Sequence, residues 1–459
     1  MMKQIKVRDN REIFERMSVP KALMTLAVPT IIGQLIVLIY SLADTFFIGR
    51  SGNPYMVAAA SLILPVFNIC IPLSNLYSIG GGTLISRLLG AGNERAASKI
   101  SMFSIVAAMG TALLYSAVFF IGMDKFLALL GASPDTVSYA RQYAFCVLVI
   151  GAVPTVLSMT MAGLLRSVGC ARQAGIGVSM GGLLNIALDP LFMFVILPRG
   201  METLGAGLAT MLSNVAACIY FIIVLWRLKG KTVLTLNPSA GLPDGKYIRE
   251  LFSVGVPASV ATLLFDVDYM IIGRLMTAHG DIPMAAVGIV LKAERLPLNV
   301  GIGLCQGMVP IAAYNYANGN HRRMKQVLHF TRTAGLIVGA VSVAMYVLFA
   351  PQIMRVFIND AETVQIGTGF LRCRAVATPF MFLCFHLVHF FQAVGEGRLS
   401  LILAVVRWAV FNIPMLFLLD ALLGQNGIVL TQVTADICTV IISYILYFRF
   451  TGSLGNEVK

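Results

Sequence analysis

Two aspartates in the first half of the chain lie within long apolar stretches, where ionisable residues are costly. Asp189 follows Asn185 by four residues, so both side chains share one helix face. Pro190 lacks an N–H and leaves a carbonyl free one turn earlier, near Ile186. Away from water a carboxyl resists ionisation, and it can load and release a proton. Asp44 and Asp189 are therefore candidates for a cation or proton site, and a structural carboxyl is the alternative for each.

The second half of the chain carries more charge within its apolar stretches. Its candidate residues are Asp266, Asp268, Lys292, Glu294, Arg295 and His386. Lys292 and Arg295 are three residues apart and share a helix face. We expect Asp266 or Asp268 to pair with one of these two basic groups, which would neutralise both charges. A direct role in transport is the alternative, and a rearranging ion pair would combine the two.

Histidine and cysteine spacings do not predict a metal site. His386 and His389 share a helix face, but no acidic ligand is near them in sequence, so we expect a hydrogen-bonded pair. The eight cysteines form no Cys-x-x-Cys pair, and we expect single buried thiols. The prediction is no resident metal and no cofactor.

Composition indicates the elements that carry these residues. The chain is 58% hydrophobic and 12% charged, whereas a soluble domain carries about 25% charged residues. Stretches of about 20 apolar residues can cross a bilayer as helices, so an all-α integral membrane protein is predicted. We expect twelve transmembrane helices, at 22–47, 55–80, 100–122, 138–160, 172–197, 205–227, 250–275, 284–310, 330–350, 364–389, 398–419 and 427–449.

Three landmarks occur twice at nearly one spacing, which indicates an internal duplication. They are Asp44-Thr-Phe-Phe-Ile-Gly-Arg50 with Asp268-Tyr-Met-Ile-Ile-Gly-Arg274, Gly92-Asn93 with Gly319-Asn320, and Val168-Gly169 with Val394-Gly395. Because an even number of spans separates the repeats, both enter the membrane in the same direction. The duplication predicts two six-helix lobes related by a pseudo-two-fold along the membrane normal. We expect an N-lobe at 1–227, a cytoplasmic linker at 228–248 and a C-lobe at 249–459.

Positive charge predicts the orientation. Lys and Arg are concentrated in the first 21 residues, in the even-to-odd loops and in the tail. By the positive-inside rule we expect both termini to be cytoplasmic. This rule also explains the net charge of +13, so the charge does not indicate a nucleic-acid partner. No cleavage site for a signal peptide is apparent, so the first span should be retained as an anchor.

Several motifs in combination resemble the multidrug and toxic compound extrusion (MATE) family. They are Pro29, Gln34 and Tyr40 with Asp44-Thr-Phe-Phe-Ile-Gly, Ala58-Ala59-Ala60, Leu64-Pro65, Gly90-Ala91-Gly92-Asn93, Leu165-Arg166-Ser167-Val168-Gly169, Asn185-Ile-Ala-Leu-Asp189-Pro190 and Gly205-Ala206-Gly207-Leu208-Ala209-Thr210. The resemblance runs along nearly the whole chain. It implies twelve helices in two lobes and export by alternating access, driven by a proton or sodium gradient.

The resemblance also indicates a branch of the family. The DinF-like branch, which includes MepA-type bacterial drug exporters, uses an acid in helix one and another in helix five, and Asp44 and Asp189 match those positions. By the same resemblance Asn185 and Thr210 would help to line the N-lobe cation site, and Tyr143 is a weaker match. Membership of this branch implies the bacterial plasma (inner) membrane.

The NorM-like branch relies instead on acids in helices seven and ten. Asp266 could correspond to the acid in helix seven. Helix ten of this chain offers His386 and His389 but no acid, which favours the N-lobe pair. The Lys292-Ala-Glu294-Arg295 cluster is outside the basic family pattern, and it could tune substrate charge preference or couple the C-lobe.

We therefore predict a multi-pass, monomeric antiporter that exports amphipathic, cationic organic compounds and contacts membrane lipid. The alternative is a lipid-linked oligosaccharide flippase, which a basic cleft would favour, with Lys292, Arg295, Arg372, Arg374 and Arg407 as its basic residues. The Asp44/Asp189 pair argues against that reading. A membrane enzyme is a distant third, because the short loops hold no phosphate-binding glycine loop, zinc motif or nucleophile elbow. A passive channel would not require paired acids.

Overall fold

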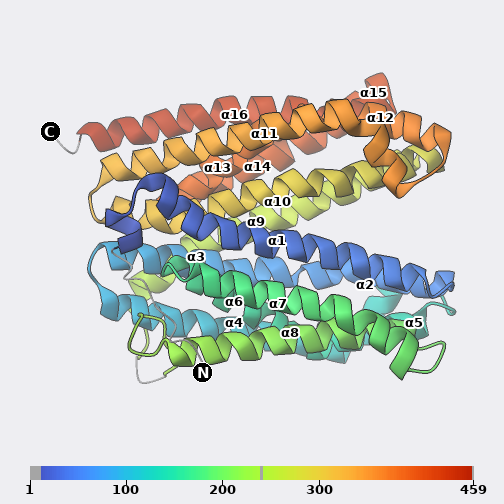
Figure 1. The fold of residues 1–459 in the computed structure, drawn as a ribbon, viewed down its shortest axis with the longest axis horizontal. Coiled ribbons are helices and arrows are strands. Elements are labelled where there is room, and N and C mark those ends of the chain that lie inside the picture. Colours follow the sequence, from blue (N-terminus) through green and yellow to red (C-terminus); the bar gives the residue numbers. More distant parts are fainter. Residues whose placement is uncertain (1–11, 238–240, 457–459) are drawn as a thin grey trace.

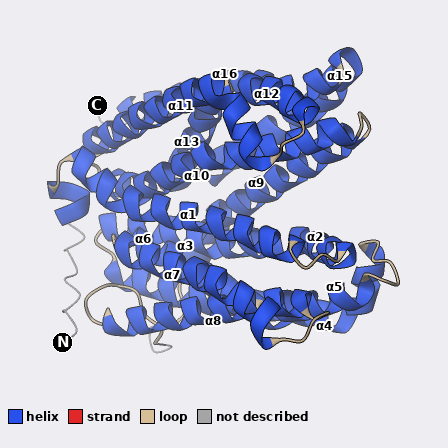
Figure 2. Ribbon diagram, turned by 45° about the vertical axis from the view of Figure 1, so that its right-hand side comes forward, coloured by secondary structure: helices blue, strands red, loops and turns tan. Residues whose placement is uncertain are grey.

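The structure, a computed structural model, describes residues 12–237 and 241–456, and within these ranges it consists of helices joined by loops (Figure 1, Figure 2). The basic residues before Glu12, the linker residues 238–240 and Lys459 lie outside the described ranges. The first half contains η1 (Glu12–Arg16), α1 (Val19–Gly49), α2 (Pro54–Asn68), α3 (Cys70–Gly90), α4 (Glu94–Leu129), α5 (Val137–Ala144), η2 (Phe145–Ile150), α6 (Ala152–Ser167), α7 (Ala171–Pro190), η3 (Leu191–Ile196) and α8 (Glu202–Arg227), where η marks a π-helical segment.

The second half repeats this arrangement. It contains α9 (Gly245–Thr277), α10 (Asp281–Ala317), α11 (His321–Phe357), α12 (Ala361–Ala375), α13 (Thr378–Val394), α14 (Gly397–Val405), η5 (Val406–Asn412), α15 (Ile413–Leu423) and α16 (Gln425–Asn456). Within the described residues, ten helices are long and apolar enough to cross a membrane, and up to 12 if each of two bent pairs is one span. The predicted all-α, twelve-span fold is confirmed.

The two bent spans have local causes. The span 137–167 bends by 46° and the span 361–394 by 45°. At Gly151 the backbone of the first span closes a π-type turn, with the Gly151 N–H donating to the carbonyl of Cys146 at 2.8 Å. A side chain at Gly151 would press on that same carbonyl, and Pro154 donates no N–H to the turn that follows. In the second span Pro379 stands just after the bend.

The repeated glycine landmarks are sharp helix ends. Gly92 and Gly319 have φ of 73° and 74°, a left-handed conformation that favours glycine. The asparagine after each glycine caps the next helix: Asn93 accepts the N–H of Ala96, and Asn320 accepts the N–H of Arg323. These duplicated residues therefore specify where two pairs of consecutive helices turn.

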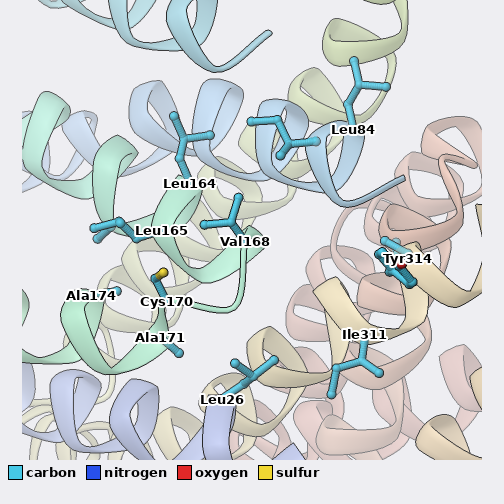
Figure 3. Close-up of a cluster of buried hydrophobic side chains, with 14 of the residues drawn as sticks. Leu26, Leu84, Leu164, Leu165, Val168, Cys170, Ala171, Ala174, Ile311 and Tyr314 are labelled. Carbon is cyan, nitrogen blue, oxygen red and sulfur yellow. The ribbon is translucent and has the colours of Figure 1, made fainter. Parts of the chain in front are cut away.

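The helices form two lobes, α1–α8 and α9–α16, and the start of α1 and the end of α16 lie at the same end of the molecule, here called the terminal end (Figure 1). Near this end the lobes interlock. A buried apolar cluster there includes Leu26 and Leu84 of the first lobe and Ile311 and Tyr314 of the second (Figure 3). Glycines permit the close approach, since a Cβ at Gly255 would collide with the carbonyl of Leu76.

Polar contacts join the lobes in the same region. Arg323 of α11 donates through Nε to the carbonyl of Phe14 and through Nη2 to that of Met17, both at 2.6 Å. Tyr314 donates to Glu15 at 2.5 Å. The segment η1 is thereby fastened to the opposite lobe, and this closes the terminal end.

We predict that Gly255→Ala lowers the melting temperature of the purified protein, because the added methyl meets rigid backbone; overpacking of this kind costs about 1–3 kcal/mol. Gly110→Ala is the control, since a Cβ there meets nothing within 4 Å. Equal melting temperatures for Gly255→Ala and the wild type, in a thermal scan in detergent, would contradict the close contact.

Candidate cation site

Small residues bring α1 against α7 and so set the position of the two N-lobe acids. A Cβ at Gly175 would lie 2.5 Å from the carbonyl oxygen of Pro29, and one at Gly182 would lie 2.7 Å from Cγ2 of Ile36. The two helices therefore touch backbone to backbone. Asp44 of α1 and Asp189 of α7 lie in the halves of these helices that are farther from the terminal end. Their two carboxyls are close enough to interact electrostatically.

The structure brings the predicted N-lobe residues together. Asp189 is 0% exposed and Asn185 is 2% exposed, while Asp44 is half-buried. Nδ2 of Asn185 donates to Oγ1 of Thr210 on α8 at 3.3 Å. The hydroxyl of Tyr143 on α5 interacts electrostatically with both aspartates. Four helices of one lobe thus contribute to a single site.

The site has more acceptors than donors. Among the described residues, no hydrogen-bond partner reaches Oδ1 of Asp44, either carboxyl oxygen of Asp189 or Oδ1 of Asn185. Buried polar atoms are normally paired, and burying a free carboxylate costs several kcal/mol. A cluster of unpaired oxygens can bind a proton or a small hard cation, because hard cations prefer oxygen ligands. Among the described residues there is no cluster of three or more His, Cys, Asp or Glu side chains that could hold a metal ion.

Tyr40 is a site residue that the sequence interpretation left without a role. Its hydroxyl interacts electrostatically with both Asp44 and Asp189. Its spacing could have identified it from the sequence, because Tyr40 precedes Asp44 by four residues and so lies on the same helix face. A phenol hydroxyl can donate to a carboxylate and accept from a protonated carboxyl.

The helix that carries Asp189 changes its hydrogen-bonding pattern at Pro190. The α-helix α7 ends at Pro190 and continues as the π-helix η3. The N–H of Leu197 reaches the carbonyl of Phe192 at 3.3 Å, a five-residue spacing. Since π-helical turns are frequent at functional sites, the irregular backbone beside Asp189 supports its assignment to the site.

The C-lobe holds a second buried charge cluster. Glu294 of α10 accepts two hydrogen bonds from Arg374 of α12, at 2.7 and 3.0 Å. Asp436 of α16 accepts from Arg407 of η5 at 2.8 Å. Asp268 of α9 is 0% exposed, interacts electrostatically with both arginines, and has no hydrogen-bond partner on either oxygen within the described residues.

The expected pairing in the C-lobe is therefore wrong for Asp268. Its charged neighbours are Arg374 and Arg407, not Lys292 or Arg295. Asp266 does interact with Arg295, whose guanidinium lies over the ring of Tyr269 at 5.3 Å. Lys292 is exposed and is part of no ion pair among the described residues.

The two histidines stand apart from this cluster. Nε2 of His386 is 3.1 Å from the carbonyl of Leu328, and Nδ1 of His389 is 2.8 Å from that of Phe385. Each ring therefore bonds to backbone, and the expected histidine–histidine hydrogen bond is wrong. All eight cysteines are free; six are buried, as expected, whereas Cys373 and Cys438 are partly exposed.

A cavity between the lobes, nearer the terminal end, is too small for an organic substrate. Its residues include Ser86 and Arg166 of the first lobe and Gln306 and His389 of the second, around about 60 Å³. Sites for drug-sized ligands have volumes of about 300–1,000 Å³. The closed lobes leave room there only for solvent-sized molecules.

Comparisons with known proteins agree with this architecture. The MatE family model matches residues 29–191 and 257–418, once in each half. The chain is 31% identical to the multidrug export protein MepA of Staphylococcus saprophyticus subsp. saprophyticus over 442 residues, 95% of this chain and 96% of the relative. It is 30% identical to MepA of Staphylococcus aureus strain MSSA476 over 451 residues, 97% of this chain and 98% of the relative.

A solved structure shares the fold. It is described as the outward-facing conformation of a multidrug resistance MATE family transporter of the MOP superfamily; the TM-score is 0.90, with 24% identity and 98% of each chain covered. Because the family model covers most of the chain and the relatives align along nearly its whole length, the chain belongs to the MATE family.

Proposed function

We propose that this protein is a proton- or sodium-coupled antiporter that exports amphipathic, cationic organic compounds. One observation supports this most strongly: two interacting carboxyls, Asp44 and Asp189, lie among unpaired acceptor atoms inside one lobe. The relatives named as multidrug export proteins support the class of substrate. Ion coupling explains why costly buried acids are present in a transporter of this kind.

The mechanism is alternating access. The lobes are closed at the terminal end, where η1 is fastened to α11. With both termini in the cytoplasm of a bacterial cell, this arrangement faces outward. A cation enters from outside, neutralises one carboxyl of the Asp44–Asp189 pair and lowers the cost of burying the pair, so the lobes can rock. Release to the cytoplasm restores the charged pair, which then favours the outward-facing arrangement again.

The flippase alternative loses support from the ion pairs. Two of its five basic residues, Arg374 and Arg407, are already bound to Glu294 and Asp436. Paired guanidinium groups offer little net charge to a pyrophosphate headgroup. Transport of cations is the function that gives the N-lobe acids Asp44 and Asp189 a role.

Reconstituted counterflow with separately imposed proton and sodium gradients tests the proposal. An inward gradient of one of the two ions should drive accumulation of a cationic dye against its own gradient. Equal dye movement with and without either gradient would contradict coupled antiport.

Asp189→Asn should abolish gradient-driven transport while the protein still folds, because a neutral amide cannot exchange a positive ion. We expect nearly the same from Asp44→Asn. Asp124→Asn is the matched control, since Asp124 is exposed and pairs with exposed Arg141. Transport should be measured in proteoliposomes after confirming a monodisperse protein. Wild-type coupling in Asp189→Asn would show that the pair has no coupling role.

Lys292→Ala should change the substrate range more than the coupling, because it removes an exposed, unpaired positive charge from α10. Cationic dyes should be favoured over anionic ones relative to the wild type. Lys125→Ala, which removes an exposed lysine of the other lobe, serves as the control. An unchanged ratio of cationic to anionic transport would rule out this role for Lys292.

A further inference from the structure

A hollow of about 240 Å³ opens on the surface of the second lobe, in the half nearer the terminal end. Helices α11 and α16 both pack against α13, whose buried His386 and Leu387 form the floor of the hollow (Figure 1). The polar residues around it are Lys325, His329 and Arg332 of α11, His386 of α13, and Tyr444 and Tyr447 of α16. A water molecule takes up about 30 Å³, so the hollow has room for a larger polar group.

The charge of this hollow is positive and is not balanced by acids. Lys325 and His329 are exposed and Arg332 is half-buried. Helices α11 and α13 contain no Asp or Glu, and the one acid of α16, Asp436, is bound to Arg407. Within the described part of the chain, Lys325 and Arg332 form no ion pair. Both cations are therefore available to an anion.

Arg332 links the three helices around the hollow electrostatically. Its Nη2 lies 2.9 Å from Nδ1 of His329, and its guanidinium interacts with the ring of His386 and the hydroxyl of Tyr447. His386 is 3% exposed; its Nε2 bonds to the carbonyl of Leu328, and no partner in the described residues reaches its Nδ1. With Nε2 as the donor, Nδ1 is left as an acceptor for a hydroxyl.

A largely apolar groove continues from the hollow along α11, away from the terminal end. It shares Arg332 and Tyr444 with the hollow and is then lined by Leu336, Ile337, Ala340 and Leu383. Ala340 is eight residues beyond Arg332, which is about 12 Å along a helix. The hydrocarbon of one membrane leaflet is about 15 Å thick, half of the bilayer core. The hollow and the groove together thus have the length and polarity of a phospholipid in one leaflet.

The repeat does not account for the basic residues of this hollow. The corresponding positions of α4, 227 residues earlier, are Ser98, Met102 and Ile105. Arg332 is also the twelfth residue of α11, well inside the helix, whereas the positive-inside rule concerns loops and helix ends. A ligand with a negative charge gives these residues a function in the second lobe alone.

We propose that the hollow binds the headgroup of an anionic phospholipid, with its phosphate between Lys325 and Arg332 and its acyl chains in the groove. Basic pockets between transmembrane helices on the cytoplasmic side bind such headgroups, and the positive-inside rule places the terminal end there. Tyr444 and Tyr447 lie at the depth where tyrosines meet the membrane interface. Phosphatidylglycerol fits best, because its headgroup hydroxyls can donate to Nδ1 of His386. The site is separate from the proposed cation site and does not depend on ion coupling.

Native mass spectrometry of the purified protein, titrated with phosphatidylglycerol in detergent, tests the site. The wild type should bind one such lipid more tightly than phosphatidylcholine. Lys325→Gln/Arg332→Gln should bind it about 25-fold more weakly, since each basic group near an anionic headgroup contributes roughly a fivefold change. Arg95→Gln/Lys99→Gln, which removes the same charge from the start of α4, is the control and should keep the wild-type affinity. An equal loss of affinity in both double variants would overturn the proposal.

A second variant separates a bound lipid from a bound free phosphate. Ala340→Trp fills the exposed groove but leaves the charges in place, so it should weaken phosphatidylglycerol binding, whereas Ala117→Trp, at an exposed position of α4, should not. Soluble glycerol 3-phosphate should fail to displace the lipid from the wild type, and this competition decides the question if Ala340→Trp does not fold. Displacement by glycerol 3-phosphate, or wild-type affinity in Ala340→Trp, would rule out a lipid site.

Discussion

An unpaired carboxyl inside a bundle of apolar helices is the constraint on which the rest of this structure depends. Asp189 is fully buried and Asp44 lies beside it, yet no donor among the described residues bonds to either Asp189 oxygen. Water and apolar side chains impose opposite demands on such a group, because it is stable charged in one and neutral in the other. Binding and releasing a positive ion satisfies both demands in turn. The charged and the neutral site are therefore stable in different surroundings, and the surroundings can change as the ion binds and leaves during a transport cycle.

The fold provides for that change. Glycines let α1 and α7 touch within a lobe, which holds the two acids together, and other glycines let the lobes touch each other at one end. Contacts within a lobe join helices of one repeat, whereas contacts between lobes join η1 to α10 and α11, and α3 to α9, across the repeat boundary. Two rigid units with one separable interface are what rocking of the lobes requires.

Much of this was predictable from the sequence, for identifiable reasons. The apolar stretches and the repeat gave the twelve spans, and the four-residue spacing of Asn185 and Asp189 placed both on one helix face. The ion pairs Glu294–Arg374 and Arg407–Asp436 were not predictable, because each joins residues of different spans, 80 and 29 positions apart, whose contact depends on tertiary packing. Local spacing instead suggested Lys292 or Arg295 as a partner of Asp266 or Asp268. Asp266 does interact with Arg295, but tertiary packing places Arg374 and Arg407 near Asp268.

The central claim is that Asp44 and Asp189 form one shielded unit whose mutual repulsion is relieved by a bound cation. A double-mutant cycle on thermal stability tests it most directly, with Asp44→Asn, Asp189→Asn and the double variant scanned in detergent at alkaline pH. The account predicts that either single replacement raises the melting temperature and that the second adds little, since one neutral partner already removes the repulsion. Sites without contact add within about 0.3–0.5 kcal/mol, and strictly additive effects, or loss of stability in both single variants, would contradict the account.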